Sequence, residues 1–174
     1  MELKRLTTVE DPMFRRAMDL YAMSFPAHEQ RRAESQREIM PNPEYHFDLI
    51  YNGTLFVGCI LYWETGEFLY VEHFFIAPEL RGRAYGSRAL ELLGQKGKRV
   101  ILEIDPPVDA ISRRRKGFYE RCGFVKNPYH HVHPPYHEGN KGHDLVVMSC
   151  PEGLPEELYQ KFFAHLCHTV MGQA

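Results

Sequence analysis

The 174-residue sequence contains no apolar run of the roughly 20 residues that a membrane-spanning helix needs. Its first residues, Met1 to Arg5, lack the apolar stretch of a secretion signal. No two cysteines form a Cys-x-x-Cys pair, and the four are Cys59, Cys122, Cys150 and Cys167. We therefore predict a cytoplasmic protein with reduced thiols and no membrane association.

The sequence also lacks a strong charge of either sign. Its formal net charge is −2, so no overall field attracts nucleic acid or an anionic membrane. Four consecutive basic residues, 113–116, form a small footprint without aromatic stacking partners, and we expect no nucleic acid partner. Hydrophobic residues make up 44% of the sequence and charged residues 25%, as is typical of a globular domain. We predict one domain over residues 1–174.

Five of the ten histidines lie between Asn127 and His143. None of them forms a helical His-x-x-x-His pair and the cysteines are remote, so we predict no metal site. The segment is instead expected to form a loop beside the functional site. Its semi-rigid walls would be Tyr129, Pro134, Pro135 and Tyr136.

Apolar periodicity predicts a mixed α/β fold. Strands are expected at 3–8, 46–51, 54–63, 68–76, 99–104 and 144–149, and helices at 12–25, 26–40, 85–97, 112–122 and from Pro155 onward. The pair Asn52-Gly53 is typical of a hairpin turn, and the order strand, helix, strand from Phe68 to Ile104 predicts a parallel βαβ unit. The fold class is thus an antiparallel meander that leads into a parallel βαβ unit, with helices on both faces. The last helix either closes the core or forms a dimer face.

The turn between strand 68–76 and the helix at Tyr85 holds the main functional signal. Pro78 ends the strand pattern, and Gly82 and Gly86 keep the loop slim. A helix N-terminus presents N–H groups without partners and the positive end of the helix dipole, so this turn is suited to bind a phosphate. An ordinary strand-to-helix turn with solvated arginines is the alternative.

The run Arg81-x-x-Ala84-x-Gly86 resembles the acyl-CoA signature of the GNAT superfamily of N-acetyltransferases, Gln/Arg-x-x-Gly-x-Gly/Ala. The resemblance implies that the main chain near Phe75 and Ile76 pairs with the pantetheine arm of CoA, and that the turn holds the pyrophosphate. The turn residues concerned are Arg81, Gly82, Arg83, Ala84, Tyr85, Gly86 and Ser87. Ala84 departs from the pattern, because the family usually has glycine there, and its methyl group narrows the approach to the backbone.

A second stretch, residues 112–124, resembles the family signature Asn-x-x-Ala-x-x-x-Tyr-x-x-x-Gly-Phe. Ser112 and Arg115 depart from it, whereas the part from Tyr119 onward matches. The resemblance implies that Tyr119 is the general acid that protonates the leaving CoA thiolate. Arg115 falls on the apolar stripe of the expected helix, where it either binds a phosphate of CoA or extends into water.

Glu72 is the first choice for the general base. It lies in the middle of an apolar strand, where desolvation is expected to raise its pKa toward a useful range. The alternative is a buried acid paired with an arginine or a histidine. His73 would point to the opposite face of a regular strand, and Glu103 on the next strand is the reserve base.

The resemblance implies an acetyl-CoA-dependent N-acetyltransferase that acts on a primary amine of a small molecule or a peptide. No Gly-x-Ser-x-Gly nucleophile motif is present, which suits direct attack by the amine in a ternary complex. Transfer of another acyl group and a CoA-binding sensor without catalysis are the alternatives. Candidate acceptor-lining residues are Phe25, His28, Glu29, Arg32 and Tyr136, although a solvated helix face accounts equally well for 26–40. The protein would be a monomer or a homodimer.

Overall fold

The chain begins with an antiparallel meander in the computed structural model, which describes residues 1–173. The meander consists of β1 (Glu2–Leu6), β2 (Tyr45–Asn52), β3 (Leu55–Glu64) and β4 (Phe68–Ile76). Gly53 has φ +61° in the turn that joins β2 to β3, as the Asn-Gly pair predicts. The sequence prediction of an antiparallel meander is confirmed.

A parallel strand follows the meander. Within residues 1–173 the strand order is β1-β2-β3-β4-β5-β8-β6, and β7 pairs with another part of β8. Only β4 and β5 are parallel among the described pairs, so the predicted βαβ unit is also confirmed. The later strands are β5 (Arg99–Ile104), β6 (Val125–Lys126), β7 (His131–His133) and β8 (His143–Cys150). The two short strands β6 and β7 were not predicted.

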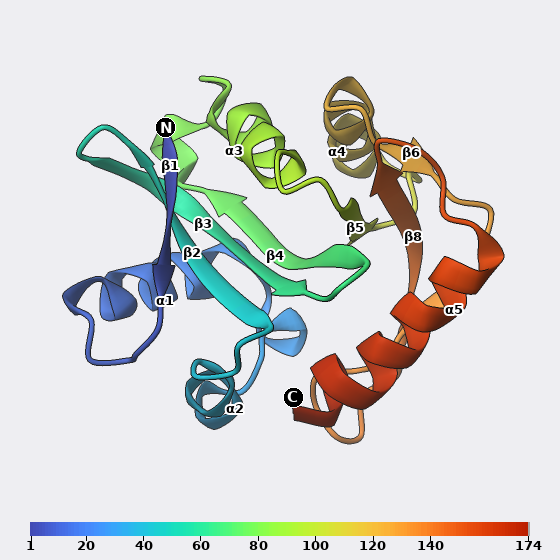
Figure 1. The fold of residues 1–174 in the computed structure, drawn as a ribbon, viewed down its shortest axis with the longest axis horizontal. Coiled ribbons are helices and arrows are strands. Elements are labelled where there is room, and N and C mark those ends of the chain that lie inside the picture. The colour runs from blue at the N-terminus through green and yellow to red at the C-terminus, as the bar shows by residue number, and fades with distance from the viewer. Residues whose placement is uncertain (174) are drawn as a thin grey trace.

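Helices cover both faces of the sheet (Figure 1). One face packs against α3 (Tyr85–Gly94) and α4 (Ala110–Arg121). The opposite face packs against α1 (Pro12–Ser24), α2 (Ala33–Ile39) and α5 (Glu156–His165). Tyr159 and Phe162 of α5 are buried, with Leu166 and Val170 of the π-helical turn Leu166–Val170. The last helix therefore closes the core, and no helix within residues 1–173 is long and apolar enough to cross a membrane.

Two helix predictions need correction. The helix expected over 26–40 is instead a 3-10 turn, η1 (Ala27–Glu29), followed by the short α2. This segment covers more of the core than its polar sequence suggested, because Arg31, Gln36 and Ile39 are buried. The helix α4 begins at Ala110 and not after Ser112. Asp109 is its N-cap, and the Asp109 carboxylate accepts bonds from the backbone N–H groups of Ile111 and Ser112.

A β-bulge interrupts β4 at Glu72. Leu61 of β3 lies opposite His73 and Tyr62 lies opposite Val71, so Glu72 is an additional residue on β4. The bulge reverses the alternation of side chains along the strand. Tyr70 before it and Phe75 after it therefore belong to the same core, although a regular strand would place them on opposite faces.

Candidate active site

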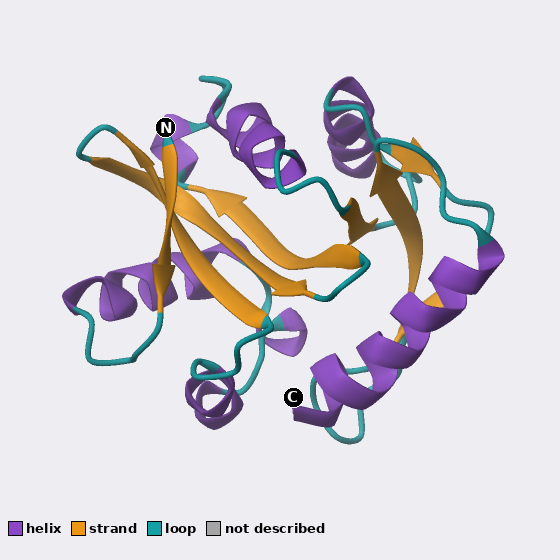
Figure 2. Cartoon of the chain, viewed as in Figure 1, coloured by secondary structure: helices purple, strands orange, loops and turns teal. Residues whose placement is uncertain are grey.

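β4 and β5 separate in the middle of the sheet. They pair only from Phe68 to Val71 and from Arg99 to Leu102, whereas β4 continues to Ile76 (Figure 2). Glu72 is the first β4 residue beyond the paired part. The residue as a whole is partly exposed, but its side chain is only 1% exposed, so the accessible surface belongs to its main chain. The gap between the strands thus leaves main-chain surface of β4 accessible to a ligand.

The turn before α3 has the geometry of an anion site. Gly82 has φ +78° and Ala84 has φ +60°, so both adopt the left-handed conformation. This conformation explains why the resembled signature has glycine at the position of Ala84. No described side chain caps α3, so the first N–H groups of the helix stay available to an anion. Residues 81–84 are exposed, and the Arg81 Nε–H donates to the Ile76 carbonyl at 3.1 Å.

Gly86 has a different role from that of Gly82. A Cβ atom at position 86 would lie 3.2 Å from the Phe118 ring of α4 and 3.5 Å from the Phe74 ring of β4. Its missing side chain therefore lets α3 pack closely against its neighbours. Gly82 needs its left-handed backbone, and no described atom lies within 4 Å of a Cβ atom there.

A cleft opens on the other side of the gap between β4 and β5. Four of the five predicted acceptor residues line it: Phe25, His28, Glu29 and Tyr136. Glu72, His73 and Glu103 line the same cleft. Arg32 is not among the described lining residues. The sequence therefore identified side chains that the fold brings together from η1, β4 and the loop before β8.

Glu72 is a buried acid in an ion pair with an arginine, which is the alternative to the predicted general base. Its Oε1 lies 2.8 Å from Arg31 Nη2 and accepts a bond from the Tyr136 hydroxyl at 3.1 Å. Its Oε2 accepts a bond from Trp63 Nε1–H at 2.8 Å. Burial alone would raise the pKa of Glu72, but the charge of Arg31 and the hydrogen bonds from Trp63 and Arg31 outweigh it and lower the pKa. The expectation of a raised pKa is wrong, and both oxygens are already engaged.

The bulge also corrects the prediction for His73. Because Glu72 is the additional residue, the side chains of Glu72 and His73 both line the cleft and do not point to opposite faces. The His73 Nε2 lies 2.9 Å from the Glu29 carbonyl oxygen, to which it donates, and its Nδ1 lies 3.9 Å from Glu72. Burial lowers the pKa of His73, so the ring is neutral at pH 7.

Glu103 belongs to a second buried network. It accepts a bond from the Tyr70 hydroxyl at 2.6 Å and a short bond from His131 Nε2. His133 Nε2 lies 3.8 Å from Glu103 Oε2, and His133 Nδ1–H donates to the Pro134 carbonyl at 2.5 Å. Burial would raise the pKa of Glu103, but His133, His131 and Tyr70 together lower it. Sequence reasoning missed His131 and His133, because only the pairing of β7 with β8 carries them to β5.

Tyr119 lies in the core on the α3 and α4 face and is 9% exposed. Its ring contacts the rings of Phe118 and Phe124. Burial raises the pKa of Tyr119 to about 12, so the hydroxyl keeps its proton at neutral pH. Arg115 lines the cleft and forms a half-exposed ion pair with Asp105 at 2.6 Å. Arg115 therefore neither lies on an apolar stripe nor extends freely into water.

Comparisons with known proteins agree on one family. The family model for the acetyltransferase (GNAT) family matches residues 13–124. A candidate GNAT acetyltransferase from Bacteroides thetaiotaomicron has a similar structure, with a TM-score of 0.90 and 32% identity over 100% of this chain and 99% of that chain. An aminoglycoside 6′-N-acetyltransferase complexed with coenzyme A has a TM-score of 0.60 and 16% identity over 90% of this chain and 100% of its own, which supports the fold alone.

The candidate acetyltransferase YjbC of Bacillus subtilis (strain 168) is similar over a shorter stretch. It is 27% identical over 67 residues, which make up 37% of this chain and 35% of YjbC. The matched stretch thus spans about a third of that relative's length.

Proposed function

This chain belongs to the GNAT acetyltransferase family, and from that premise we propose that it transfers the acetyl group of acetyl-CoA to a primary amine. The acceptor is a small molecule or a peptide, and the amine attacks the thioester directly in a ternary complex. The proposal includes a cytoplasmic location, as the sequence predicts.

The exposed main chain of Glu72 carries the proposal. It lies where β4 leaves β5, so a pantetheine arm that enters the gap can pair with β4 as a missing strand would. The CoA pyrophosphate would bind the N–H groups of the turn at residues 81–87. A backbone N–H of β4 would then donate to the thioester oxygen and stabilise the negative charge that develops on it.

The charges around the cleft favour a cationic acceptor. Four carboxylates line it, Glu29, Glu72, Glu103 and Asp105, against two cationic side chains, Arg115 and Lys141. Glu72 and Glu103 remain ionised because their pKa values are lowered. A cleft with fixed negative charge attracts an ammonium group, and this attraction raises the local concentration of the amine. Arg31 already balances the charge of Glu72, so Glu29 and Glu103 are the carboxylates that attract the acceptor, and Glu72 is not its base.

We assign the base to His133. Because its Nδ1–H donates to the Pro134 carbonyl, its Nε2 has a lone pair with which to accept a proton. The Glu103 carboxylate at 3.8 Å would stabilise the imidazolium that forms. The ammonium loses its first proton to solvent before attack, and His133 Nε2 accepts the second from the attacking nitrogen as the N–C bond forms and later releases it to solvent. The C–S bond breaks as the electron pair returns to sulfur.

Tyr119 supplies the proton for the departing thiolate. Its raised pKa, about 12, keeps the hydroxyl protonated throughout the neutral range. A thiol has a pKa of about 8.5 and is a stronger acid than Tyr119, so the proton passes from the tyrosine to sulfur only together with C–S bond cleavage, which the formation of the amide drives. Solvent then reprotonates the tyrosine.

The test is an assay of CoA thiol release by the purified chain with acetyl-CoA and a panel of amines. We expect release with at least one amine, and His133→Gln should lower kcat by roughly 100-fold with little change in acetyl-CoA affinity. Tyr119→Phe should lower kcat in the same way. Tight acetyl-CoA binding without thiol release from any amine would instead support the sensor alternative. Faster thiol release from a different acyl-CoA would mean that the transferred group is that acyl group and not acetyl.

A further inference from the structure

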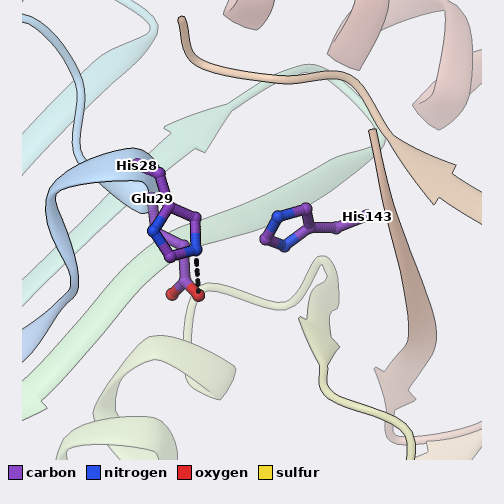
Figure 3. Close-up of side chains that lie close together, drawn as sticks. All are labelled: His28, Glu29 and His143. Atoms are coloured by element: carbon purple, nitrogen blue, oxygen red, sulfur yellow. Dashed lines mark ion pairs between the residues drawn. The ribbon is translucent and has the colours of Figure 1, made fainter. Parts of the chain in front are cut away.

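Three potential metal ligands converge at the rim of the cleft. His28 and Glu29 come from η1, and His143 is the first residue of β8 (Figure 3). One ligand atom from each residue can be chosen so that all three lie within 4.8 Å of one another. His28 Nε2 lies 3.6 Å from Glu29 Oε1, and the ring centres of His28 and His143 are 5.4 Å apart. Figure 3 shows the His143 ring pointing toward the other two side chains.

We propose that these three side chains bind a divalent transition metal ion of the Zn²⁺ type. Two imidazoles and one carboxylate form a common protein ligand set for zinc, in which the fourth position stays open for water or another ligand. Ligand atoms around tetrahedral zinc are separated by about 3.4 Å, because each lies about 2.1 Å from the ion. The 3.6 Å separation of His28 and Glu29 already fits this edge, so only His143 must move inward.

The backbone around the proposed site is well supported. The Glu29 N–H donates to the Pro26 carbonyl at 2.9 Å, and the Glu29 carbonyl accepts the 2.9 Å bond from buried His73. His137 Nε2 donates to the Ala27 carbonyl at 2.9 Å and ties the loop before β8 to η1. On the other side, His143 pairs with His133 in the β7 and β8 ladder. Two supported segments that are remote in sequence therefore hold the ligands, which limits the ordering that a bound ion must impose.

The proposed metal site is accessible to ions from solvent. The side chain of His28 is 51% exposed and that of Glu29 is 37% exposed. Both line the cleft together with His143. The carboxylates of Glu103 and Asp105 in the same lining add negative charge, partly offset by Arg115 and Lys141. A bound ion would connect η1 to β8 across the cleft.

This connection has a functional consequence that rests on the proposed acetyltransferase activity. An ion at the rim narrows the entrance and replaces negative charge with positive charge, so it opposes entry of an ammonium group. Zn²⁺ should therefore inhibit acetyl transfer by competing with the amine. The affinity for acetyl-CoA should change little with the ion, because the turn at residues 81–87 that would hold the pyrophosphate lies outside the cleft lining, and only the Glu72 end of the pantetheine path borders the cleft.

The experiment is a titration of the full chain, first freed of metal with a chelator, with Zn²⁺ by calorimetry and with Co²⁺ by visible absorption. We expect one ion per chain and a Co²⁺ spectrum of tetrahedral nitrogen and oxygen ligation. His143→Ala and His28→Ala should each weaken binding at least 10-fold. His130→Ala is the matched control, because His130 is 87% exposed, lies in the same histidine-rich segment and is outside the cluster.

Circular dichroism of each variant establishes that it is folded. The proposal is overturned if the wild-type chain binds no Zn²⁺, or if His143→Ala and His130→Ala weaken binding equally. Because binding is measured without substrates, a chain that binds the ion but transfers no acetyl group would refute the proposed function and leave the metal site intact.

Discussion

Replacing Ser87 by aspartate tests the anion-binding turn while it favours the fold. Ser87 is the third residue of α3 and is partly exposed, and its hydroxyl donates to the Ala84 carbonyl at 3.0 Å. A carboxylate in the first turn of a helix interacts favourably with the helix dipole, by about 0.3 to 1 kcal/mol. The free protein should therefore become slightly more stable or stay unchanged.

The same carboxylate should repel the CoA pyrophosphate. Two negative charges about 5 Å from a third, at an effective dielectric constant of about 60 for a partly exposed site, give about 2 kcal/mol of repulsion. We thus expect the affinity for CoA to fall roughly 30-fold. The effect should shrink as salt is added, because the Debye length falls from about 10 Å at 0.1 M to about 3 Å at 1 M.

The assay is calorimetric titration with CoA at low and high salt, with a thermal melt of each free protein. Ser87→Asn is the matched control, because it has nearly the same shape as aspartate but no charge. If the aspartate and asparagine variants bind CoA equally well at low salt, the pyrophosphate does not bind at this turn. This variant is more informative than a bulky residue at Gly86, which would disrupt packing against Phe118.

Three further substitutions test the fold. Ala84→Gly should raise the free energy of unfolding by about 0.5 kcal/mol, because it relieves a left-handed alanine at a smaller entropic cost; a lower melting temperature would contradict this. Asp48 has a pKa raised by burial from 3.8 to about 6, so the folded protein holds a proton that the unfolded chain releases, and stability should fall by about 3 kcal/mol as the pH rises from about 4 to 6. Asp48→Asn should remove that dependence, and equal urea curves for both proteins at each pH would refute the assignment. Arg31→Met should destabilise the protein by about 3 to 5 kcal/mol by leaving Glu72 charged and unpaired, and adding Glu72→Gln should recover part of the loss in urea unfolding; no recovery would mean that the pair is not the cause.

Local patterns were sufficient to predict the antiparallel meander and the parallel βαβ unit, but not the short strands β6 and β7. The hairpin at Asn52-Gly53 and the βαβ unit follow from turn chemistry and from the period of apolar residues, which act over a few positions. The acceptor-lining residues were predicted from the resemblance to the family and from the composition of two loop segments. The structure places four of the five in one cleft. Their role in binding an acceptor stays a prediction.

Long-range contacts account for what the sequence did not predict. Arg31 lies in a polar segment that resembles a solvated surface, and its remote partners, Glu72 on β4 and the Val170 carbonyl, explain its burial. No periodicity marks the bulge that places Glu72 beside His73. His28 and His143 likewise meet only through the fold, so a search for closely spaced histidines overlooks the pair. In each case the signal is a distance in space between residues that are remote in the chain.

The bulge in β4 also constrains how this strand can vary in length. Phe74 and Ile76 pack on the α3 side of the sheet, whereas Phe75 packs on the α5 side. Loss of Glu72 would restore a regular strand and leave each of these three side chains in its present layer, because Val71 and His73 already lie opposite neighbouring residues of β3. Both hydrophobic layers would then keep their side chains, so β4 should tolerate the loss of one residue at the bulge but not between His73 and Ile76, where a deletion would move the following side chains to the opposite layer.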